Sequence, residues 1–289
     1  MNWYSLIGVA LFLLLAPAIG CLLSGIDRKI TARMQRRVGP PVLQPYYDVR
    51  KLIEKDQLAV NKVVDYYVLC SFLFTIFAGC IFFAGGDLLI VVFTSTLADV
   101  FLVLAAYSCN SPYAQVGAQR EIYQLMAYEP MLLLTMIGFY LAKGSYQMWD
   151  ILTGSGVALW PMLGLFFGFL FILTIKFRKS PFDLSTSEHA HQDIVKGLTT
   201  EFSGKTLAVF EVSHWFETVL LLGVVFLFFA NGTLWSYILG LIFAFLSFFL
   251  EIIIDNSFAR MKWQVVLKSS WAVAAVLGLI NIALLLWVL

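Results

Sequence analysis

Charged residues are scarce in this chain of 289 residues, of which only 13% are Asp, Glu, Lys or Arg and 61% are hydrophobic. The mean hydropathy is +0.86. Charged residues make up about a quarter of an ordinary soluble protein. The composition therefore excludes a soluble globular domain and predicts an integral membrane protein.

Residues that hold metals and redox groups are also few, with four cysteines and three histidines. The cysteines form no C-x-x-C pair, which argues against an iron–sulfur cluster or a zinc site. Because His189 and His191 share one loop, a haem held by histidines on facing helices is difficult to assemble. We therefore expect no metal, cofactor or catalytic centre in this chain.

Long apolar runs dominate the rest of the sequence. A membrane-spanning helix needs about 20 mostly apolar residues, and these runs are continuous rather than alternating, which predicts helices. The expected fold is an all-α integral membrane protein with about eight transmembrane helices in a single domain over residues 1–289. The expected spans are residues 3–23, 66–84, 88–107, 122–142, 160–176, 206–229, 236–254 and 268–288.

The placement of basic residues predicts the orientation of these spans. If residues 27–65 face the cytoplasm, every Lys and Arg except Lys143 lies on that side, as the positive-inside rule requires. Both chain ends then lie outside (N-out, C-out). The cytoplasmic segments 27–65 and 177–205 are long, and long loops between spans are usually functional.

The first of these segments, DRKITARMQRRVGPPVLQPYYDVRKLIEKDQ from Asp27, mixes basic charge with prolines. The prolines block a helix before Tyr46, and the apolar spacing from Tyr46 to Gln57 predicts an amphipathic helix on the membrane surface or under a partner. Two interpretations remain, a docking surface and a basic flank on anionic lipid. The residues expected in a docking interface are Arg28, Arg33, Arg36, Arg37, Gln44, Asp48 and Lys51.

Five acidic residues lie inside the apolar runs: Asp99, Glu129, Glu211, Glu217 and Glu251. A charge at a helix centre costs about 2.5–3.5 kcal/mol on insertion scales, so these side chains are expected to face other helices. They predict either a proton or ion path or polar contacts between helices. At 1.5 Å per residue they fall in the cytoplasmic half. A path that ends near the midplane suggests that charge passes sideways into a neighbouring subunit.

Two further patterns lie near this path. The spacing Glu211-x-x-His214-x-x-Glu217 resembles a metal site, but residues six apart on a helix point about 120° apart, so we expect no metal. We expect His214 to hydrogen-bond to a neighbouring acid instead. The second cytoplasmic segment places Asp183, Glu188 and Glu201 at the mouth of the path, although a solvated loop is the alternative.

Four motifs follow one another along the chain: DRKITARMQRRVGPPVLQPYYDVRKLIEKD, GAQREIYQLMAYEP, SPFD and EFSGKTLAVFEVSHWFE. Over nearly its whole length the chain resembles the family of the quinone-site heel subunit of respiratory complex I and the matching subunit of energy-converting nickel–iron hydrogenases. The short run from Arg37 to Pro45 and the forms HAHQD and EVSHWFE are most similar to the Ech-type (group 4) hydrogenase branch.

The resemblance implies a subunit that anchors a hydrophilic arm in the cell (cytoplasmic) membrane. Partner subunits would carry the cofactors: the hydrogenase large and small subunits with a nickel–iron (NiFe) centre, and iron–sulfur subunits with iron–sulfur clusters. Reduced ferredoxin would donate electrons for hydrogen evolution, and antiporter-like membrane subunits would move protons or sodium ions. The alternative is a quinone-site subunit of a complex I-type NADH:quinone oxidoreductase, although the short first loop predicts no quinone pocket.

The resemblance also implies which acids form the ion path. With Asp99 added from its depth in the membrane, they are Asp99, Glu121, Glu129, Asp183, Glu188, Glu201, Glu211 and Glu217.

Overall fold

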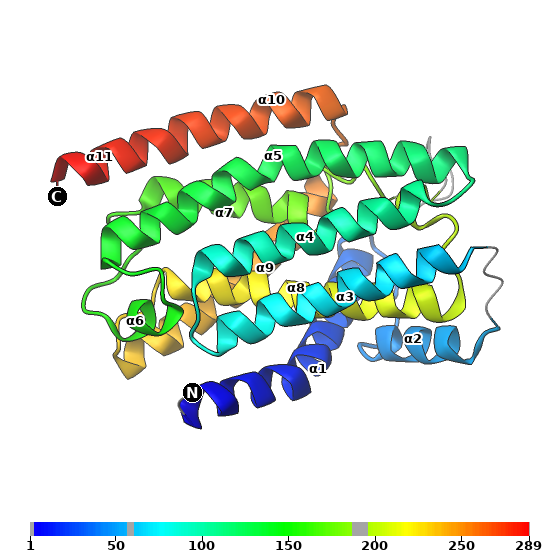
Figure 1. The fold of residues 1–289 in the computed structure, drawn as a ribbon, viewed down its shortest axis with the longest axis horizontal. Coiled ribbons are helices and arrows are strands. Elements are labelled where there is room, and N and C mark those ends of the chain that lie inside the picture. Colours follow the sequence, from blue (N-terminus) through cyan, green and yellow to red (C-terminus); the bar gives the residue numbers. More distant parts are fainter. Residues whose placement is uncertain (1–2, 57–60, 187–195, 289) are drawn as a thin grey trace.

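The computed structural model describes residues 3–56, 61–186 and 196–288, in which the regular elements are helices (Figure 1). Their bounds are α1 Trp3–Met34, α2 Gln44–Glu54, α3 Lys62–Phe83, α4 Leu88–Tyr107, α5 Pro112–Lys143, α6 Met148–Thr153, α7 Leu163–Lys176, α8 Gly204–Leu227, α9 Leu234–Ser257, α10 Trp263–Val273 and α11 Ile280–Val288. A single 3₁₀ turn, Gly197–Thr199, precedes α8, and a π-helical stretch, Ala274–Leu279, joins α10 to α11.

Seven helices of this described part are long and apolar enough to cross a membrane: α1, α3, α4, α5, α8, α9 and the continuous α10–α11. The expected all-α membrane architecture is therefore confirmed. The expected span 160–176 appears as α7, which has 14 residues. At 1.5 Å per residue α7 is about 21 Å long, shorter than the apolar core of a bilayer. The orientation of the helices stays a prediction.

Two spanning helices extend well beyond their apolar runs. The first continues through the charged residues after 23 and ends at Met34, followed by Arg36 in the left-handed conformation (φ 59°), which is a common way for a helix to end. The fourth begins at Pro112 rather than at 122, since proline is well tolerated in the first turn of a helix. Apolar runs give the membrane-crossing length of a helix and miss its polar extensions.

The amphipathic helix of the first segment is confirmed, with different bounds. It runs over Gln44–Glu54 instead of 46–57, because Pro45 lies in its first turn and starts the helix rather than blocking it. Val49 is buried in a small cluster with Cys21 of α1 and Trp215 of α8. The apolar face of α2 thus packs on this chain's own helices, and its charged face points away.

Neighbouring helices bring distant parts of the chain together. In Figure 1 α3, α4 and α5 lie side by side, and α10–α11 covers the outer side of α5. The largest core cluster lies between α5, α7 and α8 and contains Phe139, Phe166, Phe169 and Phe228. The end of α7 therefore lies inside the bundle, with helices on several sides, and its last residue is Lys176.

Candidate functional site

A lysine buried between two acids is the centre of the candidate site. The Lys176 ammonium donates to Asp99 Oδ2 at 2.6 Å and to Glu217 Oε1 at 3.0 Å. The Tyr128 hydroxyl donates to the same Asp99 oxygen at 2.5 Å. We call these four residues the Lys176 cluster. They come from α4, α5, α7 and α8, so four helices must pack correctly before the cluster exists.

Burial makes the charges of the Lys176 cluster strongly dependent on one another. The Lys176 side chain is 4% exposed, and those of Asp99 and Glu217 are 11% and 16% exposed. Charges interact several times more strongly at such depth than in water, and removing one partner of a buried ion pair costs about 3–5 kcal/mol. One ammonium group, that of Lys176, faces two carboxylates. Protonating either acid therefore weakens its ion pair with Lys176 and leaves the ammonium to the other acid.

A second buried ion pair lies beside this cluster. Arg178 Nη2 donates to Glu121 Oε1 at 2.9 Å, and both side chains are largely buried. A cavity of about 10 Å³ separates the pair from the Lys176 cluster, lined by residues of both. Within the described residues, the other Glu121 oxygen and Gln124 Oε1 are buried without a hydrogen-bond partner. The cavity has the size and polarity for about one bridging water.

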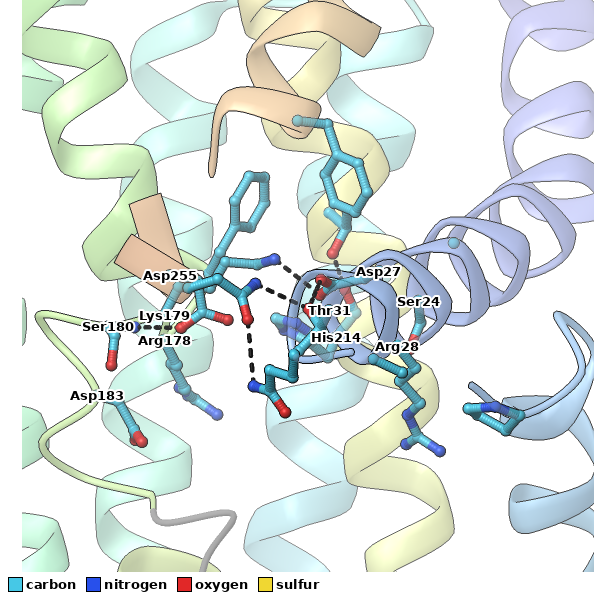
Figure 2. Close-up of a pocket in the computed structure, with 18 of the residues that line it drawn as sticks. Ser24, Asp27, Arg28, Thr31, Arg178, Lys179, Ser180, Asp183, His214 and Asp255 are labelled. Carbon is cyan, nitrogen blue, oxygen red and sulfur yellow. Dashed lines mark hydrogen bonds and ion pairs between the residues drawn. The ribbon is translucent and has the colours of Figure 1, made fainter. Parts of the chain in front are cut away.

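A larger cavity of about 560 Å³ opens where α1, α8, α9 and residues 177–183 meet. Figure 2 shows its charged side chains, with Lys179 reaching toward Asp27 of α1. The Lys179 ammonium is 2.7 Å from Asp27 Oδ2, and Arg260 pairs with Asp183. We call this cavity the vestibule. Its lining is mainly polar, whereas most small-molecule pockets are mainly apolar, which suits water and ions.

His214 of α8 lies between the vestibule and the Lys176 cluster. Glu211 and His214 line the vestibule, and His214 Nδ1 lies 3.7 Å from Glu217 Oε2. That separation is too long for a hydrogen bond, so the expected hydrogen bond from His214 to an acid is wrong. A protonated His214 would still attract Glu217. His214 and Glu217 thus place polar side chains between the vestibule and Lys176.

The structure separates the expected path acids into three groups. Asp99, Glu121 and Glu217 meet around the small cavity, and Asp183 and Glu211 line the vestibule. Glu129 is half-buried and Glu201 is exposed, and neither lines either cavity. Glu188 lies outside the described residues.

Three basic side chains of the site were missed by sequence reasoning. Lys176, Arg178 and Lys179 were counted as cytoplasmic loop charges, but each is paired with an acid inside the bundle. The sequence did contain a signal for them: the basic run KFRK ends an apolar span, and several other apolar spans contain acids. Opposite charges within one membrane bundle are expected to pair.

The expected docking residues lie in the last part of α1, in the segment just after it and on α2. Arg28 Nη1 is 2.6 Å from Asp48 Oδ2, and Gln44 donates to Asp48 Oδ1 at 2.9 Å. Partial burial tends to raise the pKa of Asp48, but these two hydrogen bonds and the charges of Arg28 and Lys51 outweigh it, so the pKa lies below its ordinary value. Exposed side chains in this group are Arg33, Arg36, Arg37 and Lys51.

The fold and the site define a multi-pass membrane protein with ion pairs buried among its helices. The chain belongs to the NADH dehydrogenase family, whose family model matches residues 6–286. The family resemblance drawn from the motifs is thus confirmed.

Individual relatives span nearly the full chain. Hydrogenase-4 component C of Escherichia coli is 28% identical, over 99% of this chain and 94% of the relative. An NADH-quinone oxidoreductase subunit from Rhodospirillum rubrum is 26% identical, over 90% of this chain and 87% of the relative. A chain of the membrane-bound sulfane sulfur reductase, an archaeal respiratory membrane complex, shares the fold with a TM-score of 0.82 and 24% identity, covering 96% of this chain and 99% of that one.

Proposed function

We propose that this chain is the membrane-anchoring and ion-coupling subunit of a multi-subunit energy-converting hydrogenase. It holds no redox centre itself and links ferredoxin-dependent hydrogen evolution on a cytoplasmic arm to proton or sodium ion translocation. The likeness to hydrogenase-4 component C over 99% of the chain supports this assignment. The observation that carries the ion-coupling role is the sharing of Lys176 between Asp99 and Glu217.

The Lys176 cluster gives this role a physical basis. Moving one charge against 100 mV requires about 2.3 kcal/mol. Losing a partner from a buried ion pair involves about 3–5 kcal/mol, which is of the same order. A proton that enters from the vestibule and binds Glu217 would neutralise that carboxylate and leave Lys176 paired with Asp99 alone. The cluster can therefore pass the electrostatic effect of an event in the vestibule to the middle of the bundle.

The partners follow from the same proposal. The hydrogenase large and small subunits and the iron–sulfur subunits would dock at α2 and the end of α1. These elements carry the Arg28–Asp48 pair and the exposed basic side chains Arg33, Arg36, Arg37 and Lys51. They would hold the nickel–iron centre and the iron–sulfur clusters. Antiporter-like membrane subunits would receive charge from the Lys176 cluster within the cell membrane.

Glutamine variants test the ion-coupling role. In membrane vesicles that hold the whole complex, Glu217→Gln should retain hydrogen evolution from reduced ferredoxin but build a much smaller ion gradient. Asp150→Asn also neutralises a carboxylate, at an exposed position that lines neither cavity, and is the matched control. A full gradient in the Glu217→Gln vesicles would refute the role assigned to the cluster.

The alternative function is that of a quinone-site subunit, and the NADH-quinone oxidoreductase relatives favour it. The vestibule is large enough for a ligand, since such pockets measure about 300–1,000 Å³, although its charged lining suits a quinone poorly. The two functions separate in a complex extracted through a tag on this chain. Nickel with hydrogen evolution supports the hydrogenase, whereas quinone reduction without nickel supports the alternative.

A further inference from the structure

Glu251 is the most deeply buried acid of the described residues that the ion path leaves out. Its exposure is 0%, although it lies on α9, whose other faces are largely exposed. Neither of its carboxyl oxygens has a hydrogen-bond partner within the described residues. An ionised carboxylate without a partner is very costly in an apolar environment, and a neutral carboxyl is far less so.

The position of Glu251 relative to the vestibule follows from its neighbours on α9. Phe248 lies three residues before it and Asp255 four residues after it, so the three side chains share one helix face. The Lys179 ammonium is 5.3 Å from the centre of the Phe248 ring, and Ser180 N donates to Asp255 Oδ1 at 2.8 Å. The residues before and after Glu251 on this face therefore contact Lys179 and Ser180, which line the vestibule. Glu251 lies between these two contacts.

Lys179 is placed to interact with more than one acid. In this structure its ammonium pairs with Asp27 of α1 at 2.7 Å, as Figure 2 shows. Lys179 and Asp255 are also the charged residues whose contacts bracket Glu251. Other titratable or charged side chains also line the vestibule: Arg28, Arg37, Arg178, Asp183, Glu211, His214 and Arg260. Lys179 is therefore the cation that could stabilise an ionised Glu251.

We propose that Glu251 is a proton-binding site beside the vestibule, and that Lys179 controls whether the proton is held. While Lys179 pairs with Asp27, Glu251 keeps its proton. When Lys179 turns from Asp27 to Glu251, the Glu251 O–H bond breaks and the proton passes through the vestibule to Asp27, whose carboxylate has lost its cation. One O–H bond breaks and one forms, so proton and charge balance.

The site would connect the docking side of the chain to proton release. Asp27 and Arg28 are consecutive on α1, and Arg28 pairs with Asp48 of α2 at 2.6 Å. A movement of α2 under a docked arm would therefore be transmitted to the Asp27–Lys179 pair. This link rests on the proposed function, whereas the proton-binding site does not.

Infrared difference spectroscopy of the extracted complex tests the proposal directly. Between neutral and alkaline pH, the carbonyl-stretch band of one protonated carboxyl should disappear, and Glu251→Gln should remove this band. Glutamine has nearly the shape of the neutral acid, so this variant is expected to fold. Asp150→Asn, at an exposed position outside both cavities, should leave the band unchanged and is the control.

A second variant tests the control by Lys179. Asp27→Asn frees Lys179 for Glu251, so the pH at which the band disappears should fall by about 1–3 units, the usual effect of a close opposite charge. A band that persists in Glu251→Gln, or a midpoint unchanged in Asp27→Asn, would overturn the proposal. The infrared band is measured without a transport or hydrogenase assay. If the band is absent, the proposed function is not affected, and if the complex is not a hydrogenase, the band is still expected.

Discussion

Replacing Lys176 by methionine removes the one cation that the Lys176 cluster shares. Methionine keeps much of the length and apolar volume of lysine, so packing changes little. Asp99 and Glu217 would then face each other in the bundle without a counter-ion. Removing one partner of a buried pair costs about 3–5 kcal/mol, and we expect a loss of this size in the free energy of unfolding.

The assay is thermal unfolding of the complex extracted in mild detergent, followed through a tag on this chain. A triple variant provides the control: Lys176→Met combined with Asp99→Asn and Glu217→Gln removes all three charges. Well-packed neutral groups often replace a buried ion network without loss of stability. The triple variant should therefore regain most of the lost stability but should not build an ion gradient.

This reasoning would be refuted if the free energy of unfolding of Lys176→Met differed by less than about 0.5 kcal/mol from that of the natural chain. That result would mean that the acids are already neutral, or that water screens them as at a surface. A triple variant as unstable as the single one would show that the packing of the lysine chain matters more than its charge.

Three smaller changes test other contacts. Tyr128→Phe removes the hydroxyl that donates to Asp99 and should cost about 1–3 kcal/mol, measured by the same thermal unfolding. Gly25→Ala should displace the segment before α2, because its Cβ would lie 1.7 Å from the Val42 carbonyl oxygen; faster proteolysis between α1 and α2 would report it. The folded chain lowers the pKa of Asp48. Its ion pair with Arg28 therefore stabilises the folded chain fully above the ordinary pKa of an aspartate, about 4. This stabilisation is lost as the pH falls through the lowered pKa. Melting scans from pH 7 to 3 should show that loss in the natural chain and not in Asp48→Asn.

The membrane helices were predictable because their signal is local. A run of about 20 apolar residues has few other stable environments than a bilayer, so each span could be placed from its own residues. The ends of α1 and α5 were not predictable in the same way. Beyond the apolar run a helix is stabilised by hydrogen bonds and packing, and hydropathy does not report either.

The candidate site was predictable only in part. The acids stood out because each is costly inside an apolar run, and two of them, Asp99 and Glu217, lie around one small cavity in the structure. Lys176 looked like the usual basic residue at the end of a span. Nothing near it in the sequence indicated that Asp99, 77 residues away, would be its partner.

The sequence by itself determined that this is a helical membrane protein, which family it belongs to, and which acids lie among its spans, because composition, motifs and helical depth depend on neighbouring residues. Only the tertiary structure decided the charge pairs. Lys176 pairs with Asp99 and Glu217, and Lys179 pairs with Asp27, whereas the Glu251 carboxyl has no hydrogen-bond partner among the described residues. These distances depend on how α1, α4, α7, α8 and α9 pack. Electrostatic energy varies with those distances and with burial, so the packing of the helices decides which acid can hold or release a proton.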